Sequence, residues 1–177
     1  ALDYAHRQGV IHRDIKPSNI MIDAEGNAFL TDFGIARAIE TSDAQGLTGT
    51  GIAIGTPGYM APEQGMGSPI DARADIYAMG VMLFEMLSGV LPYKGETPMA
   101  VIMKHINDPV PLISQVKTDL PPAVDAIIQK AMAKSPEDRY ASAGEMTRAF
   151  TAALGPNFDV NSTPIRLQAA ATQTIQD

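Results

Sequence analysis

The sequence predicts a mainly α-helical fold with one small β-hairpin, and three observations support this prediction. Residues 71–88 are apolar almost all round, as in a helix buried at the centre of a domain. Residues 97–107, 121–133 and 142–154 are expected to form three further helices. Residues 19–31 contain two short apolar stretches around the turn sequence "AEGN", which indicates a hairpin.

The first third of the chain contains a helix, a charged loop, the hairpin and a long connection. Residues 2–8 carry apolar side chains at helical spacing, and Gly9 follows as a stop signal. The segment "IHRDIKPSN", residues 11–19, then lies on a loop between this helix and the hairpin. From Gly34 to about Ser68 the sequence shows no sustained period, and so long a connection within a domain is usually a functional loop.

The later helices have clear boundary signals. Gly89 is expected to end the central helix. The pair Pro121-Pro122 is expected to begin the helix over 121–133. Ser142 and Glu145 have the spacing of a capping box. After residue 155 the sequence becomes polar, so we divide the chain into a domain over 1–155 and a flexible linker or tail over 156–177.

Composition excludes several classes of function. The chain has 177 residues, with 45% hydrophobic and 19% charged, which suits one domain or most of one. No apolar run approaches the roughly 20 residues of a membrane span, so no membrane contact is expected within this chain. The net charge of −7 argues against nucleic-acid binding. The absence of cysteine excludes thiolate metal sites and fits a reducing compartment, from which we expect a cytoplasmic location.

A second acid at the far end of the hairpin indicates that the charged loop is part of a chemical site. Asp14, Lys16 and Asn19 lie within the loop, and the hairpin should bring Asp32 back beside them. Asn19 and Asp32 offer hard oxygen ligands suited to Mg²⁺. Asp14 could accept a proton from an attacking hydroxyl, while Lys16 offers positive charge to a phosphoryl group. Taken alone, His-Arg-Asp is a weak signal, and a buried ion pair is the alternative.

Three motifs in order make the pattern specific. The stretches "HRDIKPSN", "DFG" and "GTPGYMAPE" resemble the catalytic loop, the metal-binding motif and the end of the activation segment of eukaryotic-type protein kinases. The resemblance covers residues 1 to about 154 and implies the C-terminal, helical lobe of the kinase fold. The N-terminal lobe, with its glycine-rich loop, strand lysine and adenine-binding hinge, is absent from these residues.

The resemblance implies a role for each residue of the loop and hairpin. Asp14 would be the catalytic base and Lys16 a contact to the γ-phosphate of ATP. Asn19 and Asp32 would bind Mg²⁺, with Mn²⁺ as a substitute. Met21 matches the position that packs under the adenine ring.

Further residues of these motifs would be structural. His12 and Phe33 would stack in the hydrophobic spine that aligns the lobes, and Gly34 completes the metal-binding motif. For Met21 and Phe33, plain core filling is the alternative interpretation.

Two positions bear on the residue that would be phosphorylated. Lys16 matches kinases that act on serine and threonine, because tyrosine kinases usually have alanine there. Thr56 matches the threonine that hydrogen-bonds the catalytic Asp and Lys in the same class. The resemblance therefore favours Ser/Thr specificity.

Residues 35–60 would form the activation segment. The guanidinium of Arg13 could pair with a phosphate on this segment. Thr48 and Thr50 are the best candidates for such phosphorylation, and Thr41 and Ser42 are weaker ones. The alternative is that they are ordinary solvated hydroxyls.

Two structural pairings follow from the same resemblance. Glu63 should form a buried ion pair with Arg139, and Asp75 should accept backbone donors from the loop near His12 and Arg13. Tyr77 stands where many kinases have tryptophan.

Together these features predict a serine/threonine protein kinase that transfers the γ-phosphoryl of Mg-ATP to protein hydroxyls. The partners would be protein substrates, with self-association for autophosphorylation. The 177-residue chain alone is expected to be inactive. "GTPGYMAPEQ" and "PEDRYASAGEM" resemble bacterial kinases, which often continue through a linker into a membrane span, so the full-length protein could be anchored beyond this chain.

Two alternatives remain open. The first is a catalytically dead kinase-like binding or regulatory module, which usually lacks the base or the metal-binding Asp. The second is a small-molecule phosphotransferase of the aminoglycoside type, which has neither this loop pattern nor an "APE" segment.

Overall fold

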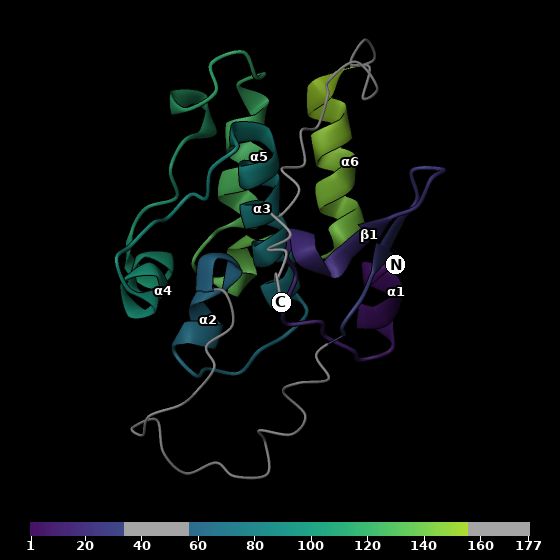
Figure 1. Cartoon of the computed structure of the whole chain (residues 1–177), viewed down its shortest axis with the longest axis horizontal. Helices are drawn as coiled ribbons and strands as arrows, with labels where there is room; N and C mark the ends of the chain where they lie inside the picture. The colour runs from purple at the N-terminus through teal and green to yellow at the C-terminus, as the bar shows by residue number, and fades with distance from the viewer. Residues whose placement is uncertain (34–56, 156–177) are drawn as a thin grey trace, which may run out of the picture.

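The computed structural model of the chain describes residues 1–33 and 57–155 (Figure 1). Within them, helices predominate and a single two-stranded sheet is present, so the predicted fold class is confirmed. The helices are α1 (Leu2–Arg7), α2 (Pro62–Gly65), α3 (Arg73–Ser88), α4 (Pro98–Asn107), α5 (Ala123–Ala131) and α6 (Ala143–Leu154). The strands are β1 (Ile20–Ile22) and β2 (Ala28–Leu30).

Helix α3 is the centre of the fold, as its apolar sequence predicts (Figure 1). One face packs Tyr77 and Phe84 into a cluster with α5, and the other packs Ile76 into a second cluster with α1 and α6. Gly80 allows α5 to approach closely, because a Cβ there would lie only 2.8 Å from that of Ala131. The helix ends at Gly89, whose φ of 77° lies in the left-handed region that favours glycine.

The starts of α4 and α6 are fixed by side-chain caps. Thr97 Oγ1 accepts a hydrogen bond from Ala100 N at 3.1 Å, and Ser142 Oγ accepts one from Glu145 N at 3.1 Å. The predicted capping box is only half formed, because the Glu145 carboxylate accepts from Ala141 N rather than from Ser142 N. This bond lowers the pKa of Glu145.

Helix α1 is attached to the start of α6 by one carboxylate. Asp3 Oδ1 accepts from Ala143 N at 2.8 Å and Oδ2 from Gly144 N at 3.0 Å. These are N–H groups of the first turn, which have no partner within their own helix, and the negative charge also suits the helix dipole. The charged loop that follows α1 therefore starts from a fixed point.

The hairpin is antiparallel, with Met21 opposite Phe29 in the register. Asp23 closes its turn, because the carboxylate accepts from the backbone N–H groups of Glu25 and Asn27 at 3.0 and 2.8 Å. Gly26 takes a φ of 86°, which explains the glycine in "AEGN". The turn returns the chain to the loop from which the hairpin began.

Three expectations concern the predicted tail, the predicted activation loop and the predicted lack of a membrane span. The predicted tail over 156–177 and the predicted activation loop up to residue 56 lie outside the described residues. Among the helices described within 1–33 and 57–155, none has the length and apolar character needed to cross a bilayer.

Candidate active site

The charged loop is held in shape by a buried carboxylate from α3. Asp75, 1% exposed, accepts from Arg13 N through Oδ1 at 2.7 Å and from His12 N through Oδ2 at 2.8 Å. Arg13 has a φ of 69°, a left-handed conformation that costs a side-chain-bearing residue energy. The expected contact between Asp75 and the loop backbone is therefore present, and it fixes a strained residue next to Asp14.

His6 is a partner of Asp75 that the sequence did not indicate. His6 Nε2 lies 2.8 Å from Asp75 Oδ2, so this carboxylate receives donors from both α1 and the loop. The two residues are 69 positions apart, and no local spacing pattern marks such a contact.

His12 connects the loop to the end of the hairpin. Its Nδ1 accepts from Asp14 N at 3.2 Å, which requires that nitrogen to be unprotonated. Its Nε2 then donates to Thr31 O at 2.8 Å. The ring also lies 4.8 Å from that of Phe33, tilted by 55°. The expected stacking pair is thus in contact, and it links the two motifs.

Asn19 brings the acidic residues of the site together. Its Nδ2 donates to the backbone oxygen of Asp14 at 2.8 Å and to Asp14 Oδ2 at 3.0 Å. Thr31, the neighbour of Asp32, donates to Asn19 O through its N–H at 2.9 Å and its hydroxyl at 3.2 Å. The loop that carries Asp14 and the hairpin end that leads into Asp32 therefore meet at Asn19.

Lys16 and Asn19 both bind the same oxygen of Asp14. Lys16 Nζ lies 2.8 Å from Asp14 Oδ2, the oxygen that also accepts from Asn19. Within residues 1–33 and 57–155, Asp14 Oδ1 has no hydrogen-bond partner, and the Asp14 side chain is 47% exposed. Among the described residues, the carboxylate is thus oriented through Oδ2 and half exposed.

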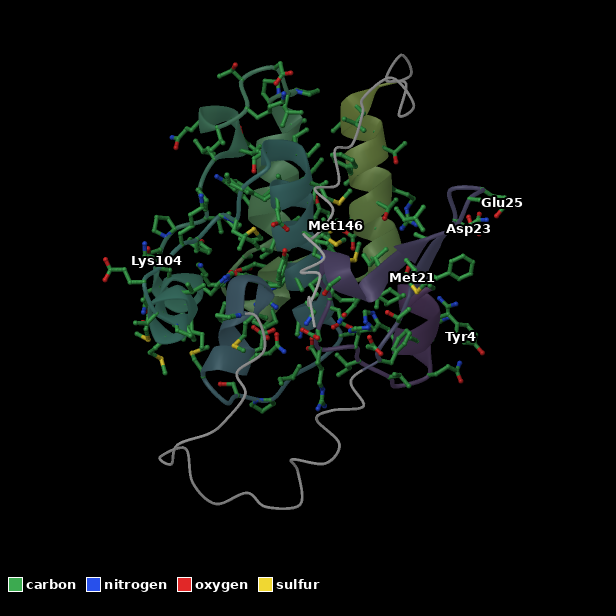
Figure 2. All side chains as sticks on the ribbon, viewed as in Figure 1. Tyr4, Met21, Asp23, Glu25, Lys104 and Met146 are labelled. Carbon is green, nitrogen blue, oxygen red and sulfur yellow. The ribbon has the colours of Figure 1, made fainter. Side chains whose placement is uncertain are left out.

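Met21 does not fill the core. It is 63% exposed, and its cross-strand partner Phe29 is 54% exposed. Figure 2 shows Met21 on the hairpin. The core-filling interpretation is therefore wrong for Met21, which lies on an accessible apolar face of the hairpin. Phe33, by contrast, is partly buried against His12.

Glu63 and Arg139 form a fully hydrogen-bonded ion pair inside the protein. Arg139 donates to both Glu63 oxygens, and its three remaining N–H groups bind the backbone oxygens of Arg73, Ala133 and Lys134. The exposures are 4% for each residue. This pair attaches α2, and with it the "APE" sequence, to the core.

Tyr77, which stands where many kinases have tryptophan, belongs to a buried polar cluster with α4. Its hydroxyl lies 2.9 Å from Nδ1 of His105. Burial, with Lys134 nearby, lowers the pKa of His105 to about 4, so the ring is neutral. Lys134 donates to His105 O and to the Tyr93 hydroxyl, and burial lowers the pKa of this lysine to about 8.

The family model described as "Protein kinase domain" matches residues 1–151 of this chain. The chain belongs to the protein kinase family.

Two similar proteins are both named as serine/threonine-protein kinases. PknD of Mycobacterium tuberculosis is 49% identical over 155 residues, which is 87% of this chain and 23% of that protein. PknB of Mycolicibacterium smegmatis is 45% identical over 147 residues, which is 82% of this chain and 23% of that protein. The chain thus spans about a quarter of the length of these relatives.

A solved kinase domain has the same fold. The structure of the PknI kinase domain of Mycobacterium tuberculosis superposes with a TM-score of 0.62 at 28% identity. The match covers 87% of this chain and 50% of that one. The expected likeness to bacterial eukaryotic-type kinases is therefore confirmed.

The kinase family uses ATP and a divalent cation, and the residues present fit a cation that also binds phosphate. Since the Asn19 amide nitrogen is committed to Asp14, the amide oxygen is the atom left to serve as a ligand, and it accepts only a long hydrogen bond from Ser18 Oγ at 3.5 Å among the described residues. Asp32 is exposed at the hairpin end. Within residues 1–33 and 57–155, no three His, Cys, Asp or Glu side chains form a metal-binding group, so phosphate and water would supply the other ligands.

Four of the predicted site residues lie outside the described ranges. They are Gly34, Thr48, Thr50 and Thr56. Their predicted roles stay predictions.

Proposed function

We propose that this chain is the catalytic-loop half of a serine/threonine protein kinase active site, which transfers the γ-phosphoryl of Mg-ATP to protein hydroxyls. The observation that supports it most directly is the Asp14 carboxylate. Oδ2 is held by Asn19 and Lys16, and Oδ1 has no donor among residues 1–33 and 57–155. A substrate hydroxyl is a donor of the right kind.

The proposed step couples a proton transfer to Asp14 with the transfer of the phosphoryl group. The substrate hydroxyl donates its proton to Asp14 Oδ1 while its oxygen bonds to the γ-phosphorus, and the bond from that phosphorus to the bridging oxygen breaks, releasing ADP. Lys16, within 2.8 Å of Asp14, places its charge beside the transferring group. Asn19 and Asp32 would hold the Mg²⁺, which neutralises phosphate charge when bound. Met21 would lie against adenine.

Specificity for serine and threonine is supported by Lys16 and by the relatives. Lys16 lies where the resemblance to Ser/Thr kinases expects it, and it contacts the proposed base directly. PknD and PknB are both named as serine/threonine-protein kinases. Thr56 would complete this arrangement.

A catalytically dead module is the competing proposal. It would have no need for an acid that Asn19 and Lys16 orient through one oxygen, or for an asparagine whose amide nitrogen is committed to that acid. Both features are present in this chain.

Activity, partners and location complete the proposal. Because the glycine-rich loop and strand lysine are absent from these residues, we expect the 177-residue chain alone to be inactive. In the full-length protein, the partners would be protein substrates and a second copy for autophosphorylation. The domain would be cytoplasmic, with a membrane anchor C-terminal to this chain.

The deciding experiment is a phosphotransfer assay on the full-length protein with labelled ATP, Mg²⁺ and a generic protein substrate. Label should appear on serine and threonine, and Asp14→Asn should reduce the rate by at least about a hundredfold. The chain of residues 1–177 assayed alone should give no transfer. Equal rates for the full-length protein and its Asp14→Asn variant would rule out the assigned base.

A further inference from the structure

Gln64 makes two hydrogen bonds that join α2 to the charged loop. Its Nε2 donates to Arg13 O at 3.0 Å, across 51 positions of sequence. Its Oε1 accepts from Ala61 N at 2.9 Å, at the start of the same helix. The second bond fixes which end of the amide faces Arg13, because only the nitrogen can donate to a carbonyl.

The bond to Arg13 O acts on the peptide group that carries Asp14. Arg13 O and Asp14 N belong to one planar peptide unit, and they point in opposite directions in a trans peptide. Asp14 N donates to Nδ1 of His12 at 3.2 Å, while Arg13 O accepts from Gln64 on the other side. Rotation of this plane would break both bonds, so the plane is fixed from two directions.

The fixed peptide follows the strained residue of the loop. Arg13 has a φ of 69°, and its N–H is bound by Asp75 of α3. Asp75 therefore anchors the amide side of Arg13, and Gln64 of α2 anchors its carbonyl side. The direction in which the next residue, Asp14, leaves the backbone depends on both anchors.

Gln64 is itself on a rigid support. The preceding residue, Glu63, is bound to Arg139 through both carboxylate oxygens and is 4% exposed. Ala61, which holds the amide oxygen of Gln64, is 0% exposed. Because the residue before Gln64 and the partner of its amide oxygen are both buried, the side chain can position its target with little freedom of its own.

We propose that Gln64 is a positioning residue for Asp14, which acts through the Arg13 carbonyl and couples the end of the "APE" sequence to the catalytic loop. This inference rests on the proposed kinase function. It makes the orientation of the proposed base depend on α2, to which Asp14 makes no hydrogen bond among the described residues. A displacement of α2 would change the position of Asp14 through the side-chain amide of Gln64.

The test compares two substitutions in the full-length protein. Gln64→Glu keeps an acceptor for Ala61 N but has no donor for Arg13 O, and Gln64→Met removes both bonds without adding charge. Gln129→Glu, at an exposed position of α5, is the matched control for the change of charge. We expect kcat to fall at least about tenfold in both Gln64 variants, with the KM for ATP within about twofold of the wild type.

A second measurement does not depend on activity. The amide proton of Asp14 should exchange with solvent faster in Gln64→Met than in the wild type, as followed by NMR of the nitrogen-labelled protein, while the amides of α3 keep their protection. Faster exchange throughout the domain would indicate general destabilisation and would overturn the proposal.

The outcomes separate the two claims. If the wild type transfers phosphate and Gln64→Met retains its kcat, the positioning role is wrong and the kinase function stands. If the wild type transfers nothing, the kinase function fails, and exchange at Asp14 still decides whether Gln64 positions that residue. Unchanged exchange at Asp14 would overturn the proposal in either case.

Discussion

The guanidinium of Arg139 faces the carboxylate of Glu63 at nitrogen–oxygen distances of 2.6 and 2.7 Å, and both side chains are buried. They lie 76 positions apart in sequence. Because Arg139 uses every N–H group it has, neither lysine nor a shifted arginine could reproduce the set. This pair therefore attaches α2 to the segment around Arg139 with a geometry that only arginine supplies.

Removal of one partner should strongly destabilise the protein. Arg139→Met would leave the Glu63 carboxylate buried without its counter-charge, and we expect the free energy of unfolding to fall by about 3–5 kcal/mol. Denaturant titration measures this. Arg73→Met, which removes a partly exposed pair with Asp71, is the control and should cost at most about 1 kcal/mol. Similar losses in both variants would contradict the assigned importance of the buried pair.

Asp75→Asn should weaken the catalytic loop. The amide has one acceptor oxygen, whereas the carboxylate has two. Either Arg13 N or His12 N therefore loses its acceptor. We expect a loss of about 1.5–3 kcal/mol in the free energy of unfolding and slower phosphotransfer by the full-length protein. His6→Ala removes only one of the bonds to Asp75 and should cost less. A larger loss of stability for His6→Ala than for Asp75→Asn would contradict the role of Asp75 as the anchor of the loop.

The buried His105 predicts a loss of stability in mild acid. Its pKa is lowered to about 4 in the folded protein, mainly by burial, whereas the unfolded chain should titrate near 6.5. The unfolded state therefore binds more protons between these values, and stability falls as pH falls below 6.5. From pH 7 to pH 5 this single group should cost about 2 kcal/mol.

His105→Gln isolates this contribution. Glutamine keeps an acceptor for the Tyr77 hydroxyl but does not titrate, so the loss of stability between pH 7 and pH 5 should be smaller than in the wild type. Chemical denaturation at the two pH values gives the difference. Parallel pH dependence in both proteins would show that the ring is not held neutral.

Phosphorylation of the predicted activation segment should control activity. We expect Thr48→Ala combined with Thr50→Ala to lower the rate of the full-length kinase, because Arg13 would lose its phosphate partner. Substitution of Thr41 and Ser42 by alanine is the matched control and should have the smaller effect. Turnover unchanged by the first pair would remove both threonines from the regulatory model.

The sequence predicts the helices well where local signals decide them. Gly89 ends α3, and Ser142 caps α6, because glycine at a left-handed position and a hydroxyl at a helix start act through neighbouring residues. α5 is shorter than the expected 121–133, since the chain is already outside helical geometry at Met132. The hairpin lies where its turn signal places it.

Contacts between distant segments were predictable only where a motif marked them. The pairing of Glu63 with Arg139 and that of Asp75 with the loop follow from the resemblance to kinases. Asp3 at the start of α6, and Gln64 at the Arg13 carbonyl, carry no such mark. Their partners are chosen by how helices dock, which a periodic pattern does not encode. The exposure of Met21 likewise depends on which elements cover the hairpin.

The hydrogen bond between Tyr77 and His105 has an evolutionary consequence. Among the residues that the structure describes, Nε2 of His105 has no partner, so the tyrosine hydroxyl is the ring's only side-chain hydrogen bond. A descendant with phenylalanine at position 77 would leave Nδ1 of a buried imidazole without its partner, which is costly. Substitutions at positions 77 and 105 should therefore arise together across lineages, as a coupled pair that sequence comparison could detect.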